Sequence, residues 1–492
     1  MNLSDLLNLS DSHEWAGEWW LPNESEKKIP GILHYDPEKG LKLTLIGSIE
    51  SRIMTLTDRG TLVMHEGSQT WEMLHGVAEQ REITLLECIP TKSLSNIGAR
   101  VKSPDKQTVM ATKALIGVHL DNPDERAFSA LEVSIEDLTH WSASSPFQTS
   151  LGIPKDKWDG RAKISVIPVE DKSVTVKGID FRLNHLHTQP YYDYQRGETI
   201  GRMRHIGFIK VIPSTPISLI EAIKNAHSLQ SLISFATHRD SGVIWLQLDL
   251  FNEEPESEEN RPSVKRTVQV LYSPSVIGKH EEPATRNIDG LFTCATLPFE
   301  EVIPRWFETY EKLQVALNMI LGLRYAPARF IESNLLTTVN AAEILHRDLN
   351  IDEIPVPANV FKKIRQAMVA QVSEEYRNRF KGMIRNDPTL RDRLYALAAR
   401  PDQEAITRII PDIDQWAKLT TQARNNLTHQ GKTPRHSFEQ LIAIIEATKA
   451  VIVFNVLAEL GLSVEVQREV AQSHPQLRLT ARRAQEWLIT PS

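Results

Sequence analysis

Hydrophobic and polar residues alternate along short segments of the first part of the chain, and this period of two predicts β-strands. Residues 31–50 contain two such segments around a Pro-Glu-Lys-Gly turn, and Leu41, Leu43 and Leu45 fall on one face of the second. The same pattern recurs at 81–89, 111–120, 128–135, 163–169, 173–183 and 206–213. Many short strands between turns predict a sandwich-like or barrel-like region, which a helix at 218–237 is expected to interrupt.

The pattern changes near residue 290 to the helical period of about 3.6 residues. Helices are predicted at 304–321, 333–349, 357–372, 388–399, 412–429 and 438–461. Pro304 fits the first turn of the first helix. The last helix begins with a capping pattern, Ser437 and Gln440, and Gly461 fits its end. Its apolar residues run nearly all round, so we expect it to be the buried centre of a bundle.

The two patterns predict an α+β multidomain chain. A β-rich region, sandwich-like or barrel-like, is expected over residues 1–285, and an all-α helical bundle over residues 300–492. The acidic stretch 252–262 is expected to form the tip of a hairpin in the β-rich region. Three tryptophans are expected to fill the core of that region, with a recognition surface as the alternative: Trp15, Trp19 and Trp20.

Composition narrows the class of protein. The chain has 492 residues, of which 41% are hydrophobic and 24% are charged, as in globular proteins. It contains no run of 18 apolar residues that would predict a membrane span, and its start lacks the pattern of a signal peptide. The two cysteines, Cys88 and Cys294, are far apart, which argues against a disulfide framework and a zinc site. We therefore expect a cytoplasmic protein that needs no cofactor.

Charge is unevenly spread along the chain. Residues 301–492 carry 25 Lys+Arg and 22 Asp+Glu, a net charge of +3, whereas the other 300 residues carry 31 and 41, a net charge of −10. A mildly basic C-terminal part is compatible with a polyanionic partner such as RNA, although an ordinary solvated surface gives the same numbers.

The segment 423–431, Ala-Arg-Asn-Asn-Leu-Thr-His-Gln-Gly, places three polar groups of chemical interest near the end of the predicted helix 412–429. Asn425 and His429 are four residues apart and share a helix face, whereas Arg424 lies about 140° around the helix from His429. A flexible arginine can still swing toward the histidine near a helix end. The C-terminal end of a helix favours a protonated imidazole, which suits general acid/base catalysis.

These residue types are sufficient to cut RNA without a metal. Arginine is always charged, and one guanidinium group can bind two phosphate oxygens at once. RNA supplies its own nucleophile, the 2′-hydroxyl, so a cation and a proton carrier complete the site. The expected products are a 2′,3′-cyclic phosphate and a 5′-hydroxyl. The spacing alone is not specific, because Arg182 and His187 share it and an ordinary helix end can carry such residues.

The segment resembles the motif of the HEPN ribonuclease domain, in which an arginine, a polar residue and a histidine recur with four to six residues between arginine and histidine. Arg424, Asn425 and His429 match this motif position by position. Residues 340–349 resemble an earlier helix of ApeA-like HEPN domains. Residues 15–50 resemble the opening of the ApeA N-terminal domain, with a Gly-x-Trp-Trp-x-Pro start followed by two leucine-containing strands. The resemblance therefore spans nearly the whole chain.

This resemblance implies an anti-phage defence protein that acts by abortive infection. Its HEPN domain would be a metal-independent endoribonuclease in which Arg424 stabilises the phosphate, Asn425 orients the reacting groups and His429 acts as acid or base. The expected substrate is tRNA, two copies of the chain would pair through the HEPN domain, and a phage protein would act as trigger at the N-terminal region. Glu343 and His346 match the pattern of the earlier helix and would pack and orient.

Other residues remain as candidates. Four cations at 374–386 form either a further RNA-binding surface or a solvated helix face: Arg377, Arg379, Lys381 and Arg385. His185 and His187 alternate on one strand face, but no third ligand stands near them in the sequence, so no metal site is predicted. Two other functions stay open. The bundle would bind RNA or a nucleotide without cutting it, or the β-rich region would act alone as the sensor of a phage component.

Overall fold

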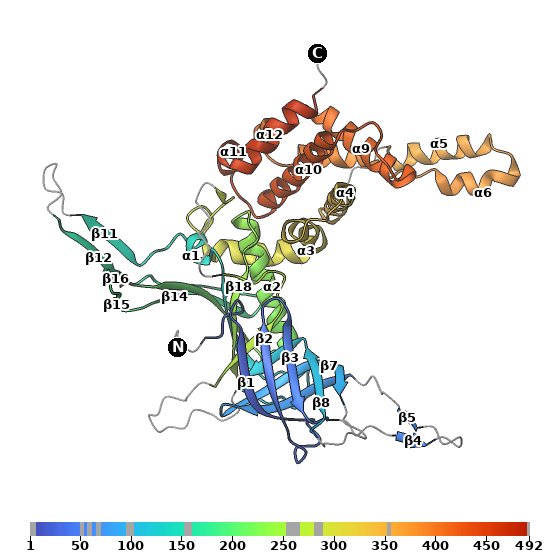
Figure 1. Cartoon of the computed structure of the whole chain (residues 1–492). Coiled ribbons are helices and arrows are strands. Elements are labelled where there is room, and N and C mark those ends of the chain that lie inside the picture. Colours follow the sequence, from blue (N-terminus) through green and yellow to red (C-terminus); the bar gives the residue numbers. More distant parts are fainter. Residues whose placement is uncertain are drawn as a thin grey trace. The chain divides into compact units, whose positions relative to one another are not determined.

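The structure, a computed structural model, describes residues 6–49, 54–56, 62–64, 70–94, 103–151, 160–251, 266–279, 289–351 and 356–489. The predicted hairpin tip at 252–262 lies outside these residues. The chain divides into two compact units (Figure 1). The β unit comprises Met1–Thr285 and Phe292–Pro304, and the helical unit comprises Arg286–Leu291 and Arg305–Ser492.

Among the described residues of the β unit, six strands close into a barrel (Figure 1). They are β1 (His13–Trp20), β2 (Ile29–Asp36), β3 (Gly40–Ile46), β6 (Trp71–Ala78), β7 (Arg81–Leu94) and β8 (Lys106–Ala111). Their order is β7, β6, β1, β2, β3 and β8, and β8 pairs again with β7. Every pairing in this ring is antiparallel, so each strand of the ring has a partner on both sides.

Alternate side chains of the strands fill the barrel, as the period of two predicts. Three leucines predicted to share a strand face and three tryptophans predicted to fill the core are at most 6% exposed, which confirms that this face is buried and that the tryptophans lie in the core: Leu41, Leu43, Leu45, Trp15, Trp19 and Trp20. Trp19 of β1 lies opposite Gly76 of β6. A Cβ atom at Gly76 would lie 2.2 Å from Cε3 of Trp19, so the glycine leaves the space that the indole occupies.

The barrel sheet continues from β7 into an open antiparallel sheet. Its strands follow in the order β9 (Lys113–Ile116), β19 (Thr267–Tyr272), β18 (Val243–Leu250), β10 (Phe128–Ile135), β17 (His205–Pro213), β14 (Ile179–His187) and β13 (Lys172–Val176). Three hairpins pair separately: β4 (Met54–Leu56) with β5 (Leu62–Met64), β11 (Phe147–Leu151) with β12 (Ala162–Val166), and β15 (Tyr191–Tyr194) with β16 (Thr199–Arg202). The single strand predicted at 173–183 is wrong, because Lys177 and Gly178 form a turn with positive φ between β13 and β14.

Helix α2 (Leu219–Ala236) confirms the helix predicted within the β unit and packs against β10. Ser218 and Glu221 cap it reciprocally, each side chain accepting a hydrogen bond from the other residue's backbone N–H. A single helical turn, α1 (Leu138–Trp141), follows β10.

An ion-pair cluster crosses three neighbouring strands of the open sheet. Lys210 Nζ on β17 lies 2.6 Å from Glu132 Oε1 on β10 and 2.7 Å from Asp249 Oδ2 on β18. The three side chains are 16%, 11% and 9% exposed, respectively. Burial lowers the pKa of Lys210, but its hydrogen bonds to the two carboxylates outweigh burial, so the pKa is raised. The charged lysine therefore neutralises two carboxylates that would otherwise be buried without a partner.

The helical unit contains α4 (Ile331–Asp348), α5 (Ala358–Ala370), α6 (Glu374–Met383), α7 (Leu390–Ala399), α8 (Gln403–Ile409), α9 (Ile413–Gln430), α10 (Phe438–Glu459), α11 (Val464–Ser473) and α12 (Pro475–Trp487). Helix α3 (Phe299–Tyr325) begins in the β unit and ends in the helical unit. All six predicted helices are present, whereas α6, α8, α11 and α12 were not among them. The predicted place of Pro304 is wrong. The helix begins five residues earlier, where Glu300 and Glu301 favour its N-terminal end.

Helix α10 is the centre of the helical unit, as predicted. Ser437 and Gln440 form the predicted capping box, and Gly461, with φ of 74°, follows the helix end. Within the described residues, α10 alone is long and apolar enough to cross a membrane, but 78% of its most apolar window is buried inside the protein. Asn455 is fully buried and donates from Nδ2 to the carbonyl oxygen of Leu397 on α7 at 2.8 Å. These features are those of a core helix.

Candidate active site in the helical unit

Helix α9 carries the predicted motif, and local signals set both of its ends. The Asp412 side chain caps the first turn by accepting a hydrogen bond from the backbone N–H of Gln415 at 2.8 Å. Gly431 ends the helix with φ of 67°, a conformation that costs glycine little. On the buried face, Trp416 donates from Nε1 to Oγ1 of Thr448 on α10 at 3.2 Å. The motif therefore lies on the last turns of a helix that is fixed against the core.

Arg424 is half-buried and reaches α4. Its side chain is 29% exposed, and its Nη2 atom lies 3.4 Å from Oε2 of Glu343. Its Nη1 atom donates to Oδ1 of Asn425 at 3.3 Å. Two of the three motif residues are thus in direct contact, and a carboxylate from another helix holds the arginine.

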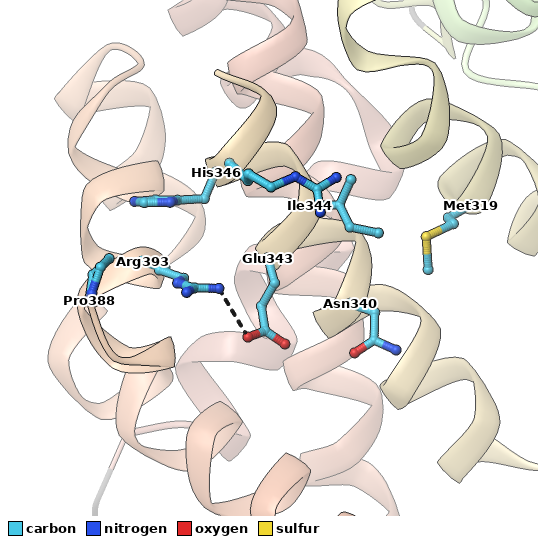
Figure 2. A pocket seen from close by; sticks show the side chains of 8 residues that line it. Met319, Asn340, Glu343, Ile344, His346, Pro388 and Arg393 are labelled. Atoms are coloured by element: carbon cyan, nitrogen blue, oxygen red, sulfur yellow. Dashed lines mark hydrogen bonds and ion pairs between the residues drawn. The ribbon is translucent and has the colours of Figure 1, made fainter. Parts of the chain in front are cut away.

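Glu343 joins two arginines from different helices. Its Oε1 atom lies 3.4 Å from Nη1 of Arg393 on α7, while Oε2 contacts Arg424. Figure 2 shows the Arg393 side chain reaching across to this carboxylate. Glu343 is 20% exposed and Arg393 is 29% exposed. A carboxylate between two guanidinium groups offsets their repulsion, so it can keep both cations close together. We call Glu343, Arg393 and Arg424 the arginine–glutamate cluster.

Sequence reasoning identified only part of this cluster. It assigned Glu343 an orienting role through the pattern of the earlier helix, and it missed Arg393. Arg393 follows the capping residues Thr389 and Asp392 on a helix that the sequence did predict. Nothing in the spacing of Arg393 distinguishes it from an exposed surface arginine, because its partner is 50 residues away in the sequence.

A cavity of about 450 Å³ lies beside the cluster (Figure 2). Its walls are formed by Met319, Asn340, Glu343, Ile344, His346, Arg347, Pro388 and Arg393. His346 is 4% exposed, and its Nε2 atom has no hydrogen-bond partner among the described residues. Burial lowers the pKa of His346, and the charge of Arg393 lowers it further, so the neutral imidazole is favoured. His346 therefore packs in the wall of the cavity, in keeping with the packing role that the sequence suggested.

His429 is exposed on the last turn of α9. Asn425 is also exposed, so the two residues share a solvent-facing surface as their spacing requires. No hydrogen bond or ion pair within the described part of the chain joins His429 to Arg424. The structure thus brings Arg424 and Asn425 together directly, and it places His429 one helical turn further on.

The other predicted RNA-binding residues belong to a different element. Arg377, Arg379 and Lys381 are exposed on α6, and Arg385 is exposed just beyond its end. They form a surface apart from the motif helix, on the helical hairpin of α5 and α6.

The second Arg-x4-His match does not form a comparable site. Arg182 and His187 both lie on β14, where residues five positions apart point to opposite faces. Arg182 is paired with Asp180, Nη2 to Oδ2, at 2.7 Å. Nearby, His185 Nδ1 lies 2.9 Å from His205 Nε2. The described residues include no group of three or more His, Cys, Asp or Glu side chains that could hold a metal ion.

The arginine–glutamate cluster can bind a phosphodiester. Both guanidinium groups are partly exposed, and their contacts with the carboxylate, at 3.4 Å, are long for charge-assisted hydrogen bonds. Phosphate oxygens can replace such contacts, because the guanidinium geometry matches phosphate as well as carboxylate. The exposed imidazole and amide on the same helix add a proton carrier and a neutral hydrogen-bonding group.

Two family models match the chain, one in its N-terminal part and one in its C-terminal part. The model of ApeA N-terminal domain 1 matches residues 14–306, which is more than half of the chain. The model of the Apea-like HEPN domain matches residues 336–466, a range that contains the whole arginine–glutamate cluster and the motif. No curated protein and no solved structure matches the chain.

Proposed function

The chain belongs to the ApeA family, and on this premise we propose that its HEPN unit is a metal-independent endoribonuclease that cuts tRNA during abortive infection. At the family level, the Apea-like HEPN domain supports a HEPN-type nuclease in anti-phage defence. The substrate, the mechanism and the site residues are the parts that we propose here.

The arginine–glutamate cluster is the observation that supports this proposal. It gathers two cations beside the motif helix, and both remain partly exposed to a ligand. Here a single carboxylate serves two guanidinium groups, which leaves a net positive charge where the motif would meet RNA.

In the proposed reaction, the 2′-hydroxyl attacks the adjacent phosphorus. The O2′–P bond forms, the P–O5′ bond breaks, and a 2′,3′-cyclic phosphate and a 5′-hydroxyl result. His429 accepts the proton of the 2′-hydroxyl. Arg424 stabilises the negative charge that develops on the phosphate, and Asn425 orients the arginine through the contact described above.

The departing 5′-oxygen needs a proton, which His429 cannot donate while it is accepting one. A homodimer solves this problem, because two copies of the motif facing one groove provide one base and one acid. We therefore propose that two copies of the chain pair through the HEPN unit. A phage component acting on the β unit is the proposed trigger.

The test is cleavage of total tRNA by the purified chain in EDTA, comparing wild type with His429→Ala and with the matched control His187→Ala. The same proteins should be expressed in cells, with RNA ends mapped after phage challenge, because the enzyme would be inactive before the trigger acts. We expect wild type and His187→Ala to yield cyclic-phosphate ends and His429→Ala to yield none.

If all three proteins cut alike, His429 is not the catalytic residue. If none cuts under either condition, the nuclease proposal fails, and binding of uncut tRNA by the wild-type chain would then support a bundle that binds RNA without cleaving it. If protection against phage survives the loss of His429, the β unit acts as a sensor in its own right and the nuclease proposal fails.

A further inference from the structure

Helices α5 and α6 form a hairpin that projects from the rest of the helical unit (Figure 1). None of the described residues of the two helices is fully buried. Large apolar side chains nevertheless recur at helical spacing and are 43–66% exposed: Val360, Ile364, Met368, Tyr376, Phe380 and Met383. The hairpin therefore leaves a row of apolar side chains uncovered, a feature that binding surfaces commonly share.

The hairpin is also the most basic part of the helical unit. Residues 358–385 contain seven Lys and Arg and two Glu, a net charge of +5 in 28 residues. The whole C-terminal part, 301–492, has a net charge of only +3, so the rest of that part is slightly acidic. The concentration of positive charge at one projection favours a polyanionic partner.

A groove of about 590 Å³ runs between the two helices. Its walls are formed by Phe361, Lys362, Arg365, Gln366, Val369, Ala370, Arg377 and Lys381, so half of them are cations. Two of these arginines also hold the hairpin together. Arg365 donates from Nη2 to the carbonyl oxygen of Lys381 at 2.5 Å, and Arg377 donates from Nε to that of Val372 at 3.0 Å. The groove is therefore a fixed feature of the hairpin, with cations along both sides.

The hairpin also carries aromatic side chains. Tyr376 and Phe380 are four residues apart on one face of α6 and are 48% and 44% exposed. Phe361 lies in the wall of the groove. A basic groove with exposed aromatic side chains on the same hairpin is a combination that suits single-stranded nucleic acid, since phosphates meet the cations and unpaired bases stack on the rings.

We propose that the α5–α6 hairpin is a binding site for unpaired RNA, separate from the motif. The net charge of +5 and the cations at half of the groove walls favour a polyanion, and a duplex would offer no free base to stack on the rings. The role of the hairpin rests on the proposed function, because the hairpin would hold the RNA that the motif cuts. The binding itself does not require cleavage.

The test measures binding of the full chain to a fluorescein-labelled 15-nucleotide 2′-O-methyl oligouridylate, which cannot be cut because its 2′-oxygen is blocked. Anisotropy is followed between 50 and 200 mM salt. The double variant Lys362→Gln/Lys381→Gln removes two phosphate contacts. The plot of log affinity against log salt concentration should become less steep by about 1.4, because each phosphate contact to a single strand contributes about 0.7 to the slope. The matched control, Arg478→Gln/Arg482→Gln on α12, removes the same charge and should leave the slope unchanged.

A second double variant, Tyr376→Leu/Phe380→Leu, tests stacking. It should weaken binding about 10-fold or more without changing the salt slope, because each stacked base contributes independently of charge. Binding of a 15-base-pair RNA duplex should not respond to this variant. Circular dichroism at 222 nm checks that each variant keeps its helices.

Two results would overturn the proposal. The first is an RNA affinity for Lys362→Gln/Lys381→Gln equal to that of the α12 control. The second is an unchanged RNA affinity for Ile364→Ser/Met368→Ser together with a changed molar mass in light scattering, which would make the hairpin a contact between protein chains. Loss of cleavage in His429→Ala tests the nuclease proposal and not the hairpin. Hairpin-dependent binding without cleavage would refute the nuclease alone, and cleavage without hairpin-dependent binding would refute this inference alone.

Discussion

Replacement of Glu343 by glutamine tests whether the arginine–glutamate cluster positions Arg424 for catalysis. The substitution keeps the shape of the side chain and removes its charge. At a separation of 3.4 Å, each arginine contact has a Coulomb energy of about 5 kcal/mol for an effective dielectric constant of about 20. Desolvation cancels much of this energy. Removing a charge from a fully buried pair costs about 3–5 kcal/mol and from an exposed pair about 0–1 kcal/mol.

The cluster lies between these limits, since its side chains are 20–29% exposed. We therefore expect Glu343→Gln to destabilise the helical unit by about 2 kcal/mol, which for a unit of this size lowers Tm by about 4–8 °C. Thermal unfolding followed by circular dichroism at 222 nm measures this shift. Glu308→Gln, an exposed carboxylate on α3, serves as the control with the same loss of charge.

The kinetic prediction separates positioning from simple structural support. Without the carboxylate, Arg424 and Arg393 repel each other and Arg424 loses its orientation, so kcat should fall about 10- to 100-fold. KM should stay the same or fall, because the RNA meets one negative charge fewer. Initial rates on tRNA in EDTA, well below the Tm of the variant, give both constants. A lowered Tm with unchanged kcat would refute the reasoning and leave Glu343 a structural residue.

Three further predictions concern the β unit. Gly76→Ala forces a Cβ atom against Trp19 and should destabilise the barrel by about 3 kcal/mol in urea unfolding followed by tryptophan fluorescence, more than the control Gly197→Ala, where nothing lies within 4 Å of the added atom. Lys210→Met leaves two buried carboxylates unpaired and should cost about 3–5 kcal/mol at pH 7; an unchanged unfolding midpoint would contradict this. Burial lowers the pKa of His205 to about 4, with neighbouring histidines adding to the effect, so its neutral ring contributes stability above pH 6.5 that is lost as the pH falls toward 4. His205→Phe should therefore flatten the decline of the unfolding midpoint between pH 7 and 5, and an equally steep decline would show that other groups cause it.

Local signals in the sequence were sufficient to place individual elements. The capping pair Ser437 and Gln440 marked the start of α10, and alternation marked the strand that carries Leu43. These signals act within a few residues, through backbone hydrogen bonds and the faces on which side chains fall. The prediction of elements failed where such signals were weak. The turn at Lys177 and Gly178 was missed, and so were the helices α6, α8, α11 and α12.

Patterns along the chain were also enough to predict the division into a β-rich and a helical part, the apolar centre of the bundle, and the motif residues on α9. Folding in three dimensions was needed to show that β8 returns to β7 and closes the barrel, and that Arg393 and Arg424 meet at Glu343. The difference lies in the range of the interactions. Helix caps and alternating faces are set by neighbours in the chain, whereas barrel closure and a shared carboxylate depend on how segments far apart in the sequence pack against one another.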